Sequence, residues 1–303
     1  MKVIKPNLRI QDTQFVCVHE FQNGHKVPIY DVMSHYALNQ ILGHVKFNNR
    51  DYGNVYYRGE CKLYPTLKPS LMRKGSNPHS LSKKLTTIIN RVANDEFLKN
   101  TLKLNNNNAK HIIEGVLQHY GIPTRNIDLV DNHWVALWMG LHHCVSHKAV
   151  EEYFFYKKRE IPFTKIATLE KIEKEELYQY VLLLALPYAD CSLYDGVRHS
   201  KDFVEIDLRQ ALPSVFVRPH AQHGIVVKRK PEECVSTDDY DLAGQVCAIF
   251  RIRIDLSAKW LGEGEMLTSQ NMFPSPAYDG GYDRLLKRND IFKERGFTIV
   301  KYL

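Results

Sequence analysis

The sequence lacks close pairs of cysteines. Its six cysteines lie far apart, at positions 17, 61, 144, 191, 234 and 247. A disulfide framework and a thiolate zinc site both depend on cysteines at short, recognisable spacings. The spacing therefore predicts neither a disulfide framework nor a zinc site, and we expect the cysteines to be reduced and structural.

Long apolar runs are missing as well. The longest, Val181 to Pro187, is far shorter than the roughly 20 residues that span a bilayer, and the opening segment MKVIKPNLRI has no signal-peptide core. We therefore expect a cytoplasmic protein with no membrane partner. With 303 residues, of which 44% are apolar, the chain can build a core without disulfides.

Three common nucleotide and hydrolase motifs are absent. The sequence contains no GxxxxGK[ST], no GxGxxG and no GxSxG. Phosphate-loop, dinucleotide-fold and nucleophile-elbow mechanisms thus lose their usual markers.

The positive charge is concentrated in one part of the chain. The formal net charge is +7, but residues 1–110 hold 17 Lys and Arg against 7 Asp and Glu, whereas the remaining residues hold 24 against 27. The basic first third favours a polyanionic ligand, either a dinucleotide or a nucleic acid.

Helical patterns dominate the first half and strand patterns the second, which predicts an α+β fold. The expected helices are 30–42, 77–102, 109–120 with a stop at Gly121, and 133–145. The expected strands are 55–58, 152–156, 180–186, 203–208, 214–219, 224–229 and 246–254. A surface helix is expected over 166–176, and one or two helices and a closing strand over 280–303.

Histidines in the predicted helix 133–145 and just beyond it raise the question of a metal. His143 and His147 would be four residues apart on one helical face, where two imidazoles can share an ion. No glutamate stands beside them as in HExxH and no third ligand is evident, so surface histidines at a helix end are the favoured interpretation and no metal is predicted.

Three polar groups stand where apolar residues would pack better. Arg58 and Gly59 end a strand, where a guanidinium can grip a phosphate and a glycine can admit a ligand to the backbone; a pair between Arg58 and Asp128 is the structural alternative. The segment LQHYGIPTRNIDL is dense in polar residues, with a buried pair of Arg125 and Asp128 as its alternative. The segment VRPHAQHGIVV places Arg218 and Gln222 between two expected strands.

These residues resemble a known family. YYRGE, LQHYGIPTRNIDLVDNHWVALWMGL, RPHAQHGIVV and MFPSPAYDGGYDRL resemble, in order and spacing, the signature blocks of the FRG domain over roughly residues 35–290. Tyr57 stands where the family has phenylalanine, and Met272 where it has leucine. The resemblance implies an N-terminal extension over 1–34 and an FRG domain over 35–303.

The resemblance implies helices packed on a split β-core related to the ADP-ribosyltransferase fold, with NAD bound as substrate in a cleft. The residues implied to bind the cofactor are Arg58, Gly59, Gln118, Tyr120, Thr124, Arg125 and Arg218. His119 would act as a base and Gln222 would orient the ribose or the acceptor, so these two are the implied catalytic residues. Glu60, Glu205, Glu263 and Glu265 are the acidic candidates, and the sequence places none of them in the cleft.

The implied activity is that of an ADP-ribosyltransferase or NAD glycohydrolase in a bacterial toxin or defence setting, acting on a protein or nucleic-acid acceptor. The alternative is a non-catalytic nucleotide-sensing or nucleic-acid-associated module. Its surface would combine aromatic and basic side chains. They are Tyr52, Tyr56, Tyr64, Lys62, Lys68, Arg73, Lys74, Lys83, Lys84 and Arg91.

Overall fold

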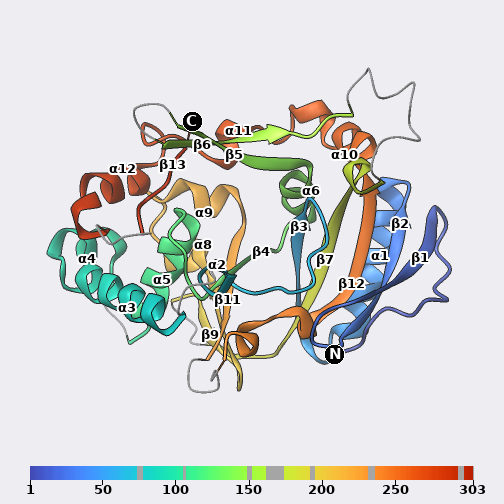
Figure 1. Ribbon diagram of the computed structural model, residues 1–303, viewed down its shortest axis with the longest axis horizontal. Coiled ribbons are helices and arrows are strands. Elements are labelled where there is room, and N and C mark those ends of the chain that lie inside the picture. Colours follow the sequence, from blue (N-terminus) through green and yellow to red (C-terminus); the bar gives the residue numbers. More distant parts are fainter. Residues whose placement is uncertain are drawn as a thin grey trace.

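The computed structural model describes residues 1–73, 78–104, 107–148, 152–161, 174–191, 195–230, 236–292 and 297–302. A large mixed sheet, a small sheet and a set of helices make up this part of the chain, in agreement with the α+β prediction (Figure 1). None of the helices described is long and apolar enough to cross a membrane.

The large sheet runs in the order β1-β2-β12-β7-β3-β4-β11-β10-β9-β8. Neighbouring strands are antiparallel except β12 and β2, which are parallel. The strands are β1 (Thr13–Glu20), β2 (Lys26–Val32), β12 (Val246–Arg253), β7 (Tyr178–Pro187), β3 (Gly53–Glu60), β4 (Ile127–Val130), β11 (Gly224–Arg229), β10 (Phe203–Asp207), β9 (Val197–His199) and β8 (Asp190–Cys191).

One junction in this sheet is narrow. β3 pairs with β7 over eight residues, but it pairs with β4 through only one residue pair, Tyr57 with Val130. The edges of β3 and β4 are therefore free of each other on both sides of that pair, which leaves room for side chains between the two strands.

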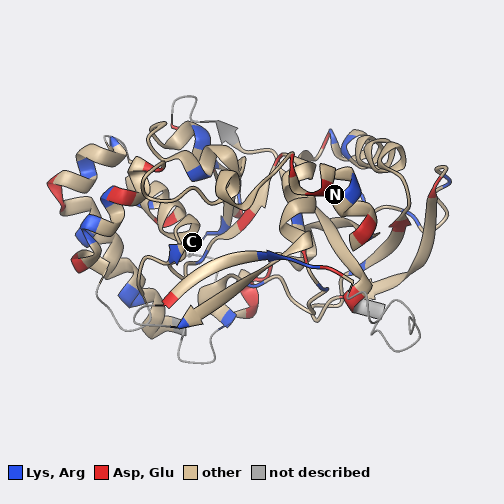
Figure 2. Ribbon diagram, turned by 90° about the horizontal axis from the view of Figure 1, so that it is seen from above, with Lys and Arg blue, Asp and Glu red and all other residues tan. Residues whose placement is uncertain are grey.

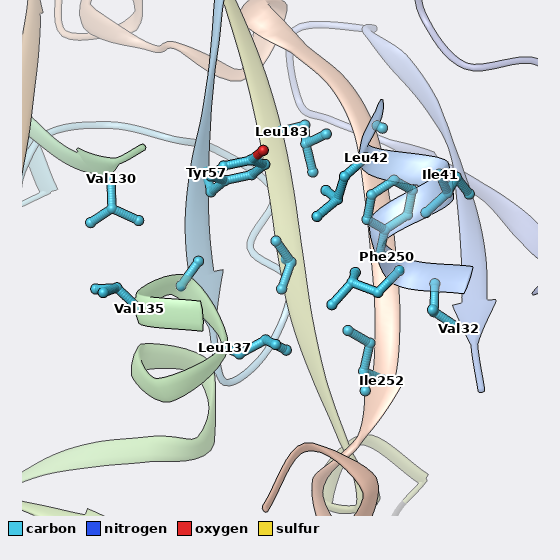
Figure 3. Close-up of a cluster of buried hydrophobic side chains, with 14 of the residues drawn as sticks. Val32, Ile41, Leu42, Tyr57, Val130, Val135, Leu137, Leu183, Phe250 and Ile252 are labelled. Atoms are coloured by element: carbon cyan, nitrogen blue, oxygen red, sulfur yellow. The ribbon is translucent and has the colours of Figure 1, made fainter. Parts of the chain in front are cut away.

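A first hydrophobic core lies between the large sheet and two helices, α1 (His35–Asn49) and α6 (His133–Leu141). Figure 3 shows side chains of both helices directed toward Leu183 of β7 and Phe250 of β12. β7 reads as a continuous apolar run because both of its faces are covered, which is typical of a strand in the middle of a sheet.

A second hydrophobic core is built mainly from helices. The helices α3 (Pro78–Asn94), α4 (Glu96–Leu102), α5 (Ala109–His119), α8 (Leu208–Ala211) and α12 (Gly280–Lys287) bury their apolar faces together with one face of β10 and β11. Gly121 follows α5 with φ of 93°, so the predicted glycine stop is confirmed. The predicted helix 77–102 is two helices, because Asp95 caps a new one.

The remaining helices are short. They are α2 (Ser70–Arg73), α9 (Val217–Ala221), α10 (Ile254–Trp260), α11 (Ser269–Met272) and the 3-10 turns η2 (Lys174–Leu177), η4 (Asp238–Tyr240), η5 (Ala243–Gln245), η6 (Gly262–Gly264) and η7 (Asn289–Phe292).

The small sheet joins three segments in the order β13-β6-β5 and crosses the top of the view in Figure 1. It consists of β5 (His142–Lys148), β6 (Glu152–Lys158) and β13 (Lys301–Tyr302). The helix predicted over 133–145 therefore ends at Leu141. His143 and His147 lie on a strand, where four residues span about 13 Å, too far for one metal ion.

Two further sequence predictions need correction. The helix predicted from Tyr30 begins only at His35, because Tyr30 to Val32 belong to β2. The strand predicted over 214–219 does not form: Val217–Ala221 is a helical turn, so Arg218 and Gln222 do not lie in a hairpin. Most of the predicted helix 166–176 lies outside the described residues.

Residues 1–34 supply the edge of the large sheet. β1 and β2 lie in this segment, and β2 pairs with β12. Ile4 is buried in the first hydrophobic core, beside α1 and α6. The segment predicted as an extension thus shares its hydrophobic core with the region that follows.

Candidate functional site

A cavity of about 600 Å³ lies beside the narrow junction of β3 and β4. Its volume is within the usual range for ligand pockets. Eight separate stretches of the sequence contribute to its wall. The lining residues are Tyr57, Arg58, Gly59, Glu60, Cys61, Lys62, Tyr64, Gln118, His119, Asp128, Leu129, Val130, Ala136, Met139, His142, His143, Cys144, Tyr156, Gln222, Phe273 and Tyr302.

The end of β3 supplies an ion pair to this cavity. Arg58 and Glu60 are two residues apart on a strand and so lie on the same face. The Arg58 Nε donates to Glu60 Oε1 over 2.5 Å, and Nη1 donates to the backbone carbonyl of Asp128 over 2.7 Å. Burial acts to lower the pKa of Arg58, but Glu60 and Asp128 outweigh it and hold that pKa above its usual value. Arg58 is therefore a permanent cation in the wall.

Gly59 lies between them with a different role from the predicted one. A Cβ at this position would lie 1.8 Å from the carbonyl oxygen of Ala136 and 2.8 Å from the amide nitrogen of Gly140. Both atoms belong to α6. The packing of α6 against β3 is therefore what requires a glycine here.

A hydrogen-bonded chain joins α5 to β4 in the part of the cavity wall next to Arg58. Thr124 Oγ1 donates to Gln118 Oε1 over 2.6 Å, and Gln118 Nε2 donates to Asp128 Oδ2 over 2.6 Å. His119 Nδ1 lies 3.7 Å from Asp128 Oδ1. The polar density of LQHYGIPTRNIDL thus orients one carboxylate and one imidazole toward the same cavity.

Asp128 is an ionised carboxylate in this arrangement. Burial acts to raise its pKa, but His119 and Gln118 together with the nearby Arg58 outweigh burial, so the pKa of Asp128 lies below its usual value. Its side chain is 43% exposed, whereas that of His119 is only 5% exposed. His119 Nε2 is buried and has no hydrogen-bond partner among the described residues.

Aromatic rings form another wall. The rings of Tyr156 and Phe273 stack with centroids 4.0 Å apart and planes 18° apart, and Tyr302 lies beside Phe273 at 5.1 Å. Gln222 Nε2 donates to the carbonyl of Met272, which holds the segment before Phe273 in place. Gln222 therefore has a structural hydrogen bond in addition to its place in the cavity wall.

Five of the nine predicted site residues line this cavity: Arg58, Gly59, Gln118, His119 and Gln222. Four do not. Thr124 is fully buried and acts through Gln118, and the Tyr120 hydroxyl donates to Asp279 over 2.7 Å in the core. Arg125 and Arg218 also lie outside the cavity lining.

The pair of Arg125 and Asp128, the structural alternative for this segment, does not form. Arg125 Nε and Nη2 donate to the two carboxylate oxygens of Glu114 over 2.9 and 2.8 Å, and Lys228 contacts the same carboxylate. Glu114 and Lys228 are buried, so this cluster belongs to the core. Arg218 is also fully buried and lies behind the cavity wall.

Among the acidic candidates, Glu60 lines the cavity and the others lie elsewhere. Glu205 accepts hydrogen bonds from Tyr56 and Arg198 inside the sheet, and Glu263 pairs with Lys158 at 3.3 Å. Alternation along the predicted strand 55–58 would have put Glu60 on the side of Arg58. No local signal indicated the aromatic wall, because its rings come from three distant segments.

The predicted nucleic-acid surface is not continuous. Tyr56 is buried, and the Tyr52 hydroxyl is bonded to Gln245, so only Tyr64 of the three tyrosines is well exposed. Lys68 pairs with Asp238, and Lys74 lies outside the described residues. Figure 2 shows Lys and Arg interspersed with Asp and Glu along the ribbon. Within the described ranges, no three His, Cys, Asp or Glu side chains gather as metal ligands would.

The chain was compared with known proteins and families. Neither the curated proteins nor the solved structures gave a match. Of the cavity residues, those from Tyr57 to Cys144 fall inside the one segment that matched a family, whereas Tyr156, Gln222, Phe273 and Tyr302 fall outside it. That segment, residues 53–148, matches the FRG domain, which supports the family resemblance of the β3-to-β5 region.

Proposed function

We propose that the cavity binds NAD and that the protein cleaves its nicotinamide–ribose bond, passing ADP-ribose to water or to a macromolecular acceptor. The observation that carries the proposal is Glu60, a carboxylate that lines the same cavity as Arg58. Of the four acidic candidates, Glu60 is the one that lines the cavity together with Arg58, which supports the proposal.

The wall offers complementary groups for a dinucleotide. Arg58 Nη2 makes no hydrogen bond to a described residue, and Lys62 is exposed at the cavity, so both can reach a pyrophosphate. The stacked rings of Tyr156 and Phe273 suit a planar base. These features support a ligand with a base at one end and phosphates at the other.

The carboxylates suit the chemistry of this bond. When the C1′–N bond breaks, its electron pair leaves with nicotinamide and the ribose carbon takes on positive charge. Glu60 would stabilise that charge in a partly dry site. The pair of His119 and Asp128, in which Asp128 is the more exposed member, would accept the proton of the incoming water or acceptor hydroxyl as the new C1′–O bond forms.

The test uses the full chain with NAD labelled in its ADP-ribose half, with and without cell lysate. We expect nicotinamide release, and Glu60→Gln should reduce it about 100-fold or more because an amide carries no charge to stabilise the transition state. The matched control is Glu263→Gln, which changes a surface glutamate outside the cavity and should leave the rate unchanged. Absence of both turnover and saturable NAD binding in the unaltered chain would contradict the proposal.

A second candidate is nucleotide binding without cleavage. It is favoured by one contact: Glu60 Oε1 is already engaged by Arg58 Nε at 2.5 Å, so the carboxylate is not free until the pair rearranges. In that case NAD and ADP-ribose would bind with Arg58-dependent affinity in calorimetry, and no nicotinamide would appear. The toxin or defence setting and the identity of any acceptor stay predictions from the resemblance.

A further inference from the structure

Arg218 is a buried cation whose guanidinium forms no ion pair with a carboxylate of the described residues. It is fully buried on α9, and no acidic side chain in the described ranges lies within 4.0 Å of its guanidinium. Nη1 donates to the carbonyl of His119 over 3.2 Å, while Nε and Nη2 have no hydrogen-bond partner among the described residues. Asp279 is bonded to the backbone amide of Arg218 rather than to its guanidinium.

Aromatic faces surround this guanidinium. Its central carbon lies 4.4 Å from the ring centroid of Tyr302, 5.4 Å from Phe273, 4.6 Å from Tyr120 and 4.8 Å from Tyr282. Cation–π contacts offset part of the cost of burying the charge but leave its sign unchanged.

Two of these rings separate Arg218 from the cavity. Tyr302 and Phe273 belong to the cavity wall, and so does His119, whose carbonyl Arg218 holds. The field of the guanidinium reaches that wall: burial raises the pKa of Tyr156 well above its usual value, and Arg218 acts in the opposite direction.

The charged groups of the wall itself balance one another. Arg58 and Lys62 are positive, and Glu60 and Asp128 are negative. The buried Asp279 carboxylate offsets the charge of Arg218 on the Tyr120 side, whereas at Tyr156 and Tyr302 of the cavity wall Arg218 acts to lower the pKa. On the cavity side the positive charge of Arg218 can therefore favour a negatively charged ligand.

We infer that Arg218 is a specificity-determining residue of this cavity, which favours ligands that bear a phosphate over ligands that lack one, without touching them. The inference rests on the proposed nucleotide site and adds a second source of anion selectivity to Arg58. Arg218 was predicted to contact the cofactor; its burial and its cover of rings indicate an action through the wall instead.

The experiment compares two probes that share a base and a ribose, adenosine and ADP, by calorimetry on the full chain. Arg218→Met should weaken ADP binding about tenfold, the effect of removing one charge several ångströms away in a protein interior, and change adenosine binding less than twofold. Arg218→Lys, which keeps the charge, should restore most of the ADP affinity. Equal losses for both probes would mean a merely structural role and overturn the inference.

A second variant covers the case in which Arg218→Met does not fold. Tyr302→Leu removes a ring that covers the guanidinium and should keep or increase the preference for ADP over adenosine; loss of that preference would contradict the inference. ADP binding that depends on Arg218, in a chain that releases no nicotinamide, would support the inference while removing the proposed activity. Nicotinamide release with no effect of Arg218 on ADP binding would do the reverse.

Discussion

Two arginines of the predicted site have opposite environments. Arg58 lines the cavity and has a nitrogen, Nη2, that bonds to none of the described residues, whereas Arg125 is committed to Glu114 through a bidentate pair. Both lie in segments that resemble the same family, so the sequence alone ranks them together. Only their partners separate a ligand-binding arginine from a structural one.

Substitution of each arginine should therefore have a different effect. Arg125→Met should lower the free energy of unfolding by about 3 kcal/mol, since it leaves the buried Glu114 short of one partner, and should leave NAD affinity within about twofold. Arg58→Met should weaken NAD binding by about tenfold or more through the loss of a charged hydrogen bond to phosphate. Urea unfolding and calorimetry on both variants check the pair, and equal effects on NAD binding would contradict it.

At the scale of the element, helix periodicity and strand composition placed most segments correctly. Leu85, Ile88 and Val92 are buried in the second hydrophobic core, as the helical periodicity predicted. The segments around residues 181, 225 and 249 that were predicted as strands are β7, β11 and β12. The errors lie at boundaries. The apolar run after Asn132 continues through a change from helix to strand at His142, because β6 offers β5 a pairing edge that no local pattern reveals.

The contact of β3 with α6 gives a prediction about elements. Gly59→Ala should destabilise the protein by about 3 kcal/mol, because the added methyl meets backbone atoms of α6 that cannot move aside independently. Thermal unfolding measures the effect. Gly43→Ala is the matched control: a Cβ there meets nothing within 4 Å, and alanine in helix α1 should be neutral or stabilising by up to about 1 kcal/mol.

At the scale of the whole molecule, two histidines on helices of the two hydrophobic cores, His111 on α5 and His133 on α6, have a lowered pKa. Burial and then Lys228 lower the pKa of His111 to about 4, and burial and then Lys46 lower that of His133 to about 4. Their unfolded value is about 6.5. Between pH 6.5 and 4 the unfolded chain therefore binds more protons than the folded one, and stability falls as the pH falls.

We expect each histidine to remove about 2 kcal/mol of stability over this range. Urea unfolding at pH 7, 5.5 and 4.5 measures the slope, and the His111→Gln, His133→Gln double variant should have a flatter one. A slope that the two substitutions leave unchanged would assign the acid sensitivity to other groups.

The sequence by itself determined the α+β class, the order of most helices and strands, and the QHYG-to-VAL block, because periodicity and glycine stops are local properties. It also identified Arg58, Gln118 and His119, which do line one cavity. Tertiary structure alone decided the rest: that Glu114 rather than Asp128 binds Arg125, that three distant segments build the aromatic wall, and that Arg218 lies behind it. Contacts of this kind depend on which surfaces meet when two cores close together, and no local pattern encodes that meeting.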